Sequence, residues 1–247
     1  YRDVTDRRQA ETRLRNYANQ LAQANEELSQ YAQVVCHDMC TPLRAVRMYT
    51  HLLRQDISSA SPDESLSHLD TIERAVIEGQ QMAQELLNFG QIYEDQLVWE
   101  NVPMDKLLDN VIALFALSPD VEITRTKRQW PVIEGVPMLL HQVFNNLIDN
   151  AIKFNESSQK KVKVGWKRIN GEGYEFFVRD NGLGVAPEYY EKIFQIFGRV
   201  HPRERYDGNG MGLAIVKKAV TRLNGRVWVT SKPGNGSTFH VSLPDRR

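Results

Sequence analysis

This sequence of 247 residues has no long apolar run, only two cysteines and no excess of either charge. No stretch approaches the roughly 20 apolar residues that span a bilayer, and no signal-peptide pattern opens the chain, so we expect no membrane insertion within this segment. Two cysteines are too few for a disulfide framework, which indicates a reducing, cytoplasmic compartment. Lys plus Arg and Asp plus Glu both number 31, and this balance argues against a nucleic-acid partner.

Glycine is rare in the first part of the chain, where residues 1–96 contain only Gly79 and Gly90. This part is rich in Gln, Glu, Arg, Leu and Ala, which favour helix. Apolar or small side chains recur at alternating spacings of three and four, at Leu14, Tyr17, Leu21, Ala24, Leu28, Tyr31 and Val35. This heptad pattern predicts a coiled coil over residues 1–30 that leads in from an upstream domain.

A second helical pattern runs over residues 64–96, after a loop that ends at Ser61 and Pro62. Two helices joined by a short loop form an antiparallel hairpin and cannot bury both apolar seams alone. We therefore expect residues 31–96 to dimerise, so that two hairpins make a four-helix bundle.

Strand and helix patterns alternate from residue 97 to the end of the chain. Apolar residues at every second position predict strands over 162–166, 174–178, 227–229 and 239–243. Helical patterns lie at 103–117, 137–154, 187–194 and 211–224. The expected fold of residues 97–247 is an α/β sandwich with its helices on one face of a sheet, which makes the whole chain a multidomain protein of α and α+β type.

Clusters of polar residues and glycines punctuate both parts. In chain order they are His37-Asp38-Met39-Cys40-Thr41-Pro42-Leu43, then Asn146 to Phe154, then Asp180-Asn181-Gly182-Leu183-Gly184, then Gly208-Asn209-Gly210-Met211-Gly212-Leu213, and finally Gly234 to Phe239. In this order they resemble the H, N, G1, G2 and G3 boxes of the sensor histidine kinases, with Phe194 and Phe197 where the F box lies. Residues 197–244 are most similar to the kinases attached to phytochrome-type photoreceptors, and Asp3-Val4-Thr5-Asp6 resembles the end of a PAS sensor domain.

The resemblance implies that His37 accepts the γ-phosphoryl group of ATP in a homodimer and passes it to a response regulator receiver domain. Imidazole suits this role because it is unprotonated and basic near neutral pH. Asp38 is then a hydrogen-bond partner or general base for the ring, and Thr41 orients water for dephosphorylation of the regulator.

The same resemblance implies an ATP-binding site with Mg²⁺ as cofactor. Asn150 is matched to Mg²⁺ and Asn146 to the phosphates, since an amide oxygen is a hard neutral ligand that Mg²⁺ accepts. Asp180 would accept a hydrogen bond from the adenine amino group, and Thr238 either bounds the adenine pocket or is an ordinary strand threonine. The other nucleotide-binding residues implied are Lys153, Gly182, Gly184, Phe194, Arg199, Gly208, Gly210, Gly212 and Leu213. Gly208, Gly210 and Gly212 precede a helix whose free amides favour phosphate. Arg199 belongs to a polar segment, 198–208, expected to form the ATP lid, where an arginine would neutralise phosphoryl charge.

Two other functions share this pattern. An ATPase of the gyrase, MutL and heat-shock-90 type needs a glutamate four residues before the metal asparagine, where this chain has Asn146. A neutral amide is a poor general base, so transfer to His37 is favoured over hydrolysis. A non-catalytic signalling dimer is disfavoured because the nucleotide boxes are intact. Cys36 and Cys40 are one helical turn apart, which suits two small buried hydrophobic side chains better than a disulfide.

Replacing Leu21 and Leu28 together by Asp should lower the stability of the dimer, because it puts charges into the predicted heptad seam. Light scattering at low micromolar concentration measures the effect as a loss of mass. An unchanged mass would contradict the predicted seam.

Overall fold

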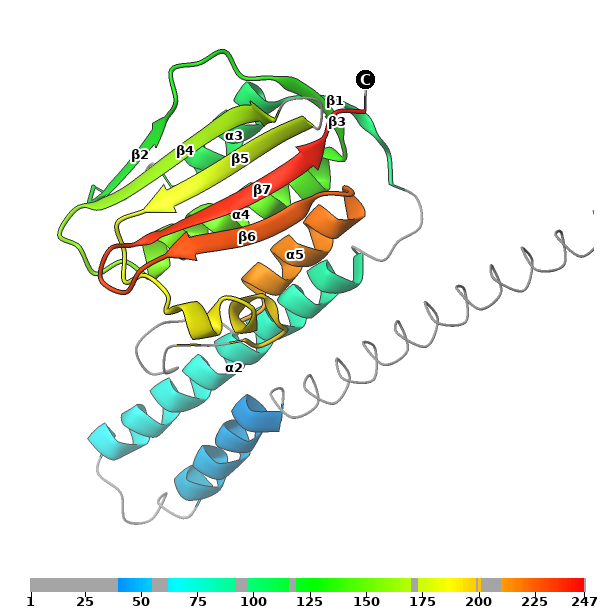
Figure 1. Cartoon of the computed structure of the whole chain (residues 1–247). Helices are drawn as coiled ribbons and strands as arrows, with labels where there is room; N and C mark the ends of the chain where they lie inside the picture. Colours follow the sequence, from blue (N-terminus) through cyan, green and yellow to red (C-terminus); the bar gives the residue numbers. More distant parts are fainter. Residues whose placement is uncertain are drawn as a thin grey trace, which may run out of the picture. The chain divides into compact units, whose positions relative to one another are not determined.

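The computed structural model describes residues 40–54, 62–91, 97–115, 119–169, 173–198, 200 and 210–246. The chain divides into two units, one that ends at Gln84 and one that begins at Glu85 (Figure 1). The predicted coiled coil with Leu21 and Leu28, and the predicted acceptor His37, lie outside the described residues. Among the described helices, none has the combined length and hydropathy of a membrane-crossing segment.

The first unit contains an antiparallel helical hairpin. Its first helix covers residues 40–54, and its second, α2, spans Pro62–Gln91. Pro42, near the start of the first helix, approaches Gly79 late in α2, where an added Cβ would lie 3.9 Å from the proline ring. Tyr49 instead packs on His68, early in α2, with ring centroids 5.5 Å apart. The predicted hairpin is confirmed.

Apolar side chains on both helices of the hairpin are exposed in the single chain. They are Leu43, Met48, Leu66, Leu69, Val76 and Ile77. Cys40 is exposed as well, so its interpretation as a small buried side chain is wrong. The reason is helical geometry: Pro42 is buried, and a residue two positions earlier points to nearly the opposite side of the helix.

The second unit is a layered α/β domain. Its elements, in chain order, are β1 (Glu100–Pro103), α3 (Met104–Ala113), β2 (Val121–Arg125), β3 (Val132–Gly135), α4 (Pro137–Lys153), β4 (Lys160–Ile169), β5 (Gly173–Asp180), the 3₁₀ turns η1 (Pro187–Tyr189) and η2 (Lys192–Phe194), α5 (Gly212–Arg222), β6 (Arg226–Ser231) and β7 (Ser237–Pro244). The main sheet has the order β2-β4-β5-β7-β6, with β2 parallel to β4 and the other pairs antiparallel. β1 and β3 form a separate antiparallel pair.

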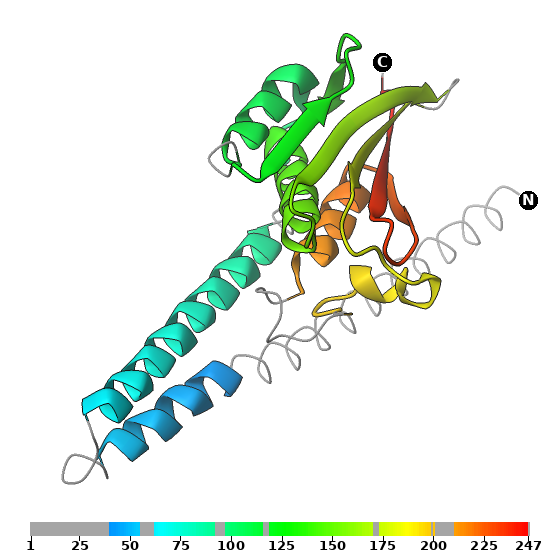
Figure 2. The same cartoon turned by 90° about the vertical axis from the view of Figure 1, so that its left-hand side faces the viewer.

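Helices α4 and α5 pack against one face of the main sheet (Figure 2). Phe176 on β5 is fully buried at the centre of this layer. The ring of Phe144 on α4 meets it edge-on at a centroid distance of 5.7 Å, and Trp130 stacks on it at 6.3 Å. The core therefore lies between β5 and α4, and burial of these apolar surfaces fixes the helix against the sheet.

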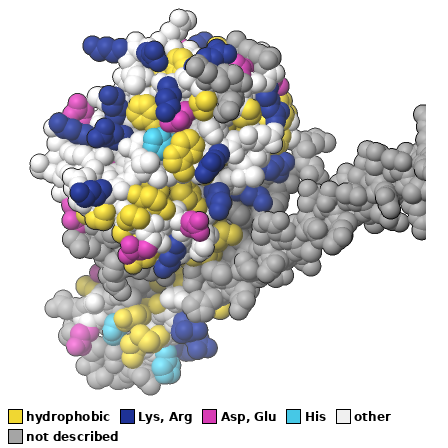
Figure 3. All heavy atoms as spheres, viewed as in Figure 1, with side chains coloured by type: hydrophobic (Ala, Val, Ile, Leu, Met, Phe, Trp, Pro, Cys, Tyr) yellow, Lys and Arg dark blue, Asp and Glu magenta, His cyan; other side chains and the backbone are white. Residues whose placement is uncertain are grey.

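The opposite face of the sheet is open and mixes hydrophobic with charged side chains (Figure 3). Trp228 stacks on His240 with ring centroids 5.0 Å apart. His240 also contacts Glu175 through Nδ1 at 3.0 Å and Thr230 through Nε2 at 2.9 Å. These contacts join β5, β7 and β6 on the side away from α4.

The structure confirms the predicted sandwich, its four predicted strands and three of its four predicted helices. The helix predicted over 187–194 is wrong. Tyr190 N–H bonds to Pro187 O and Phe194 N–H to Glu191 O, so each backbone bond closes over three residues and the segment forms two 3₁₀ turns. A stretch this short gains little from helix formation, because nucleation costs more than its few bonds return.

Candidate functional site

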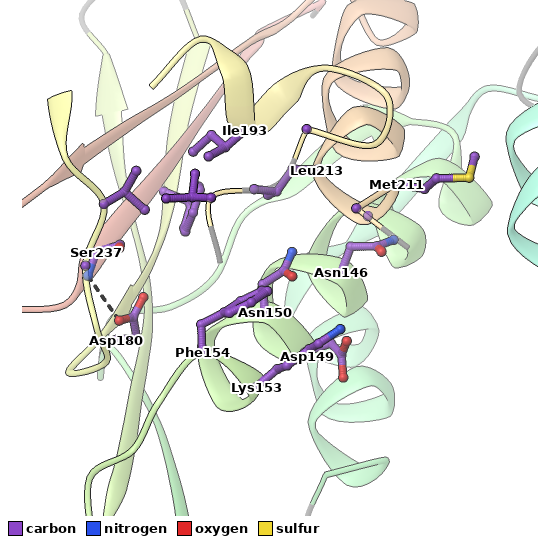
Figure 4. A pocket seen from close by; sticks show the side chains of 17 residues that line it. Asn146, Asp149, Asn150, Lys153, Phe154, Asp180, Ile193, Met211, Leu213 and Ser237 are labelled. Carbon is purple, nitrogen blue, oxygen red and sulfur yellow. Dashed lines mark hydrogen bonds between the residues drawn. The ribbon is translucent and has the colours of Figure 1, made fainter. Parts of the chain in front are cut away.

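A cavity opens between α4, the start of α5, and the ends of β5 and β7 (Figure 4). Its lining residues are Asn146, Asp149, Asn150, Lys153, Phe154, Asp180, Gly184, Val185, Ile193, Gly198, Val200, Gly210, Met211, Gly212, Leu213, Ser237 and Phe239. Eight residues predicted from the sequence are therefore brought together here: Asn146, Asn150, Lys153, Asp180, Gly184, Gly210, Gly212 and Leu213.

The two asparagines stand on the face of α4 that looks toward α5. Nδ2 of Asn146 donates to the carbonyl of Gln142 at 2.8 Å, which leaves Oδ1 as the polar atom directed away from its own helix. A Cβ added to Gly212 would lie 2.8 Å from that Oδ1 and 3.6 Å from Nδ2 of Asn150. A larger residue at the start of α5 would therefore displace Oδ1 of Asn146, whereas its contact with Asn150 would be an ordinary one.

Asp180 ends β5 at the other side of the cavity and is only 9% exposed. Its Oδ1 accepts hydrogen bonds from the backbone N–H groups of Gly182 at 2.8 Å and Ser237 at 3.0 Å. Desolvation by burial raises the pKa of Asp180, while these two hydrogen bonds and the charge of Arg179 oppose the rise. With Oδ1 occupied, Oδ2 is the acceptor left for a ligand.

Gly182 and Gly184 shape the loop after Asp180 in different ways. Gly184 lines the cavity with φ +71°, and a Cβ there would lie 2.2 Å from the carbonyl oxygen of Lys232. Gly182 is buried behind the lining, where a Cβ would lie 2.4 Å from the carbonyl oxygen of Phe154. Both positions exclude any side chain because backbone meets backbone there.

The start of α5 supplies backbone N–H donors to the cavity. The first bond inside the helix runs from Ile215 N–H to Met211 O, so the amides of the residues before Ile215 have no partner within the helix. Among the described side chains, none caps this terminus. Gly210, with φ +71°, turns the chain into it. These amides and the helix dipole favour an anionic group in the cavity.

Apolar and basic side chains complete the walls. Ile193 and Phe239 line the cavity, and Phe194 supports them from behind, meeting Phe239 edge-on at a centroid distance of 6.3 Å. Lys153, at the end of α4, lies with its ammonium 5.4 Å from the centroid of the Phe154 ring.

Thr238 does not line the cavity, whereas its neighbours Ser237 and Phe239 do. Burial alternates along β7, so that Ser237 and Phe239 are buried on the inner face and Thr238 lies on the outer one. The sequence interpretation did not include Ser237 or Phe239, although this alternation was the signal that distinguishes them from Thr238.

Five further predicted residues fall into two groups. His37, Asp38, Arg199 and Gly208 lie outside the described residues. Thr41 is an exposed helical residue of the first unit. The lining residues that sequence reasoning missed are mostly apolar or small: Val185, Ile193, Gly198, Val200, Met211, Ser237 and Phe239, together with Asp149 and Phe154.

Two family models match the chain. Residues 27–94 match the His Kinase A (phospho-acceptor) domain, and residues 135–247 match the histidine kinase-, DNA gyrase B-, and HSP90-like ATPase. The first range contains His37 and Thr41, and the second contains every residue of the cavity.

Similar proteins include two phytochromes. The phytochrome-like protein Cph1 of Synechocystis sp. is 35% identical over 242 residues, which cover 96% of this chain and 32% of Cph1. Cyanobacterial phytochrome A of Nostoc sp. is 34% identical, over 94% of this chain and 30% of that protein. The signal transduction histidine-protein kinase BarA of Escherichia coli is 30% identical, over 87% of this chain and 24% of BarA. The chain thus spans about a third of the length of the phytochromes that it matches.

Solved structures share the fold. Full-length ShkA, crystallised with AMPPNP, matches with a TM-score of 0.60 and 27% identity, over 87% of this chain and 45% of ShkA. Histidine kinase ThkA, in complex with the response regulator protein TrrA, matches with a TM-score of 0.67 over 88% of this chain and 63% of that chain. The ThkA chain is only 18% identical, and the likeness shows the fold alone.

Asp180→Asn should weaken ATP binding by about tenfold or more, because the two backbone donors on Oδ1 would hold the amide oxygen there and leave the amino group facing the ligand. In the unchanged protein, affinity should fall as the pH is lowered through the pKa of Asp180. Since that pKa is raised, the loss should begin at a higher pH than for an ordinary aspartate. Calorimetric titration measures both effects.

Asp120→Asn is the matched control, because Asp120 pairs with Lys160 outside the cavity. Equal ATP affinity in wild type and Asp180→Asn would mean that the base binds elsewhere.

Proposed function

The chain belongs to the sensor histidine kinases, and from that premise we propose that it transfers the γ-phosphoryl group of Mg-ATP to His37 and then passes it to an aspartate of a response regulator. The observation that carries this proposal is the cavity itself. It has a buried carboxylate at one end. At the other end is the start of α5, which no described side chain caps, with two asparagines beside it.

This polarity matches the two ends of ATP. A carboxylate oxygen accepts from the exocyclic amino group of adenine, and Ile193 and Phe239 offer an apolar surface to the base. The triphosphate then extends toward the amides of Gly212 and Leu213, where the helix dipole favours its charge. Lys153, another lining residue, adds a positive charge to the cavity. ShkA was crystallised with AMPPNP, an ATP analogue, which supports the same assignment here.

The asparagine pair fits a magnesium ion that also binds phosphate. Asn146 directs its carbonyl oxygen away from its helix because its amide nitrogen is bound to Gln142. We assign Asn150 to Mg²⁺ and Asn146 to the phosphate side, through the metal or water. When bound, the ion neutralises part of the charge on the phosphate oxygens.

The transfer step requires a nucleophile that attacks phosphorus in line with the leaving ADP. The lone pair of one imidazole nitrogen of His37 forms the new N–P bond while the bond from the γ-phosphorus to the bridging oxygen of ADP breaks. Asp38 accepts a hydrogen bond from the other ring nitrogen and stabilises the positive charge that develops on the ring. Arg199 in the lid is assigned to the charge on the transferred group.

Hydrolysis is the competing reaction of this fold, and the geometry of Asn146 disfavours it. Its Nδ2 is already engaged with Gln142, and its Oδ1 belongs to an amide with no useful basicity. A water molecule in the cavity would find no general base at this position. Phosphoryl transfer to an external acceptor remains the better fit.

We further propose that the chain acts as a cytoplasmic homodimer with a sensor domain of PAS or phytochrome type as its upstream partner. Six exposed apolar side chains on the hairpin helices support dimerisation: Leu43, Met48, Leu66, Leu69, Val76 and Ile77. The phytochromes among its relatives support the sensor type. A response regulator is the proposed acceptor, because residues 27–94 match the phospho-acceptor domain of histidine kinases.

His37→Gln should abolish labelling by γ-labelled ATP while leaving nucleotide affinity unchanged, because acceptor and cavity belong to different modules. The wild-type label should be acid-labile and base-stable, as expected of a phosphorus–nitrogen bond. His51→Gln, which changes an exposed histidine of the first helix of the hairpin, is the control and should label normally. Label that persists on His37→Gln would overturn the assignment.

Thr41→Ala should keep most of the labelling of His37, but the rate at which it dephosphorylates the regulator should fall by about tenfold to 100-fold. Thr41 is four residues beyond His37, the spacing of one helical turn, and a hydroxyl can orient an attacking water, a role that attack on ATP does not need. Both rates are measured with a purified cognate regulator. Thr50→Ala removes another exposed threonine of this helix as a control. Equal loss of both rates would mean that Thr41 only supports the helix.

A further inference from the structure

Ser231, the last residue of β6, connects the two loops beside Asp180. Its Oγ accepts a hydrogen bond from Val185 N–H at 2.8 Å and donates to the carbonyl of Gly236 at 2.8 Å. A hydroxyl has one proton, so the 3.0 Å contact with Ser237 Oγ is a bond that Ser237 donates. All three hydrogen-bonding positions of this hydroxyl are therefore used within the site.

Tyr190 holds the backbone of the same residue. β6 is an edge strand of the sheet, and Ser231 has backbone groups that β7 does not pair. Its N–H donates to the phenol oxygen of Tyr190 at 2.9 Å, and its carbonyl accepts from the phenol hydroxyl. One side chain thus takes the place of a neighbouring strand and fixes where β6 ends.

The network continues from Ser231 to the carboxylate. Ser237, bound to Ser231 through its hydroxyl, donates its backbone N–H to Oδ1 of Asp180 at 3.0 Å. The packing around this link is tight, since a Cβ on Gly236 would lie 2.2 Å from the carbonyl oxygen of Asp180. Ser231 itself is not among the lining residues, although Val185 and Ser237 are. It therefore acts on the cavity only through its neighbours.

We propose that Ser231, clamped by Tyr190, is a positioning residue that sets the preference of the site for 6-aminopurine nucleotides. By fixing Ser237, it fixes the plane of the Asp180 carboxylate and so aims Oδ2 at the amino group of the base. The inference rests on the proposed function and deepens it, because it traces selection of the base to a residue outside the cavity.

The test compares the affinities of the 247-residue chain for ATP and for purine riboside 5′-triphosphate, which lacks the 6-amino group. Wild type should prefer ATP. Ser231→Ala should reduce this preference about fivefold, mainly by lowering the affinity for ATP. The loss of one net hydrogen bond costs about 1 kcal/mol of binding free energy, which corresponds to this factor. The ATP concentration for half-maximal labelling of His37 should rise, while the labelling rate at saturation should stay near that of wild type.

Three further variants sharpen the test. Ser231→Thr keeps the hydroxyl and should restore the preference. Tyr190→Phe removes only the phenol hydroxyl and should lower the preference by a smaller factor. Thr230→Ala is the matched control, because Thr230 precedes Ser231 but bonds to His240 on the outer face of the sheet, and it should leave the preference unchanged.

The outcomes separate this inference from the proposed function. If Ser231→Ala lowers the affinity for both nucleotides equally, or for neither, Ser231 is a packing residue. The inference is then wrong, while the kinase assignment stands. If wild type fails to distinguish the two nucleotides, or does not bind ATP, the role of Asp180 in the proposed function falls as well. If thermal unfolding shows that Ser231→Ala is not folded, the nucleotide preference of Tyr190→Phe tests the inference instead: an unchanged preference would contradict it.

Discussion

Backbone must meet backbone around Asp180 for the cavity to exist. The loops that follow β5 and β6 approach each other so closely that an added Cβ at Gly184 or Gly236 would lie 2.2 Å from a carbonyl oxygen. Both glycines also have positive φ, which other residues adopt only with strain. This contact brings the N–H of Ser237 onto Asp180, and the buried carboxylate has its orientation because of it.

Across the cavity, the packing of α4 determines which polar groups face the ligand. Its buried side, with Phe144 against Phe176, is fixed by the core. Asn146 and Asn150 are four residues apart and so emerge together on another side of the helix. The hydrophobic register of α4 thus places two amides beside the start of α5, and the small size of Gly212 leaves room for the nearer one, Asn146. A core residue and a site residue are in this way parts of one constraint.

Sequence patterns predicted those parts of the fold whose interactions are local. The alternation of apolar residues along β4, β5 and β7 could be recognised because each strand has eight or more residues. β1, β2 and β3 have only four or five residues and were not predicted. Asp180 and the asparagines were predicted from short motifs. Ile193 and the Tyr190–Ser231 link were not, because they depend on contacts between residues far apart in the chain, 41 positions for that link. Thr238 was included as a site residue because the alternation along its strand was not used to decide which face of the sheet its side chain lies on.

The parallel pairing of β2 with β4 has a consequence for how the domain folds. A parallel neighbour cannot be joined by a tight turn, and here the crossover between the two strands contains β3 and the whole of α4. The antiparallel pair β4 and β5 needs only a short loop, so its closure costs less chain entropy. We expect the hairpin of β4 and β5 to form early and to collect α4, with β2 joining the edge only after that helix has docked.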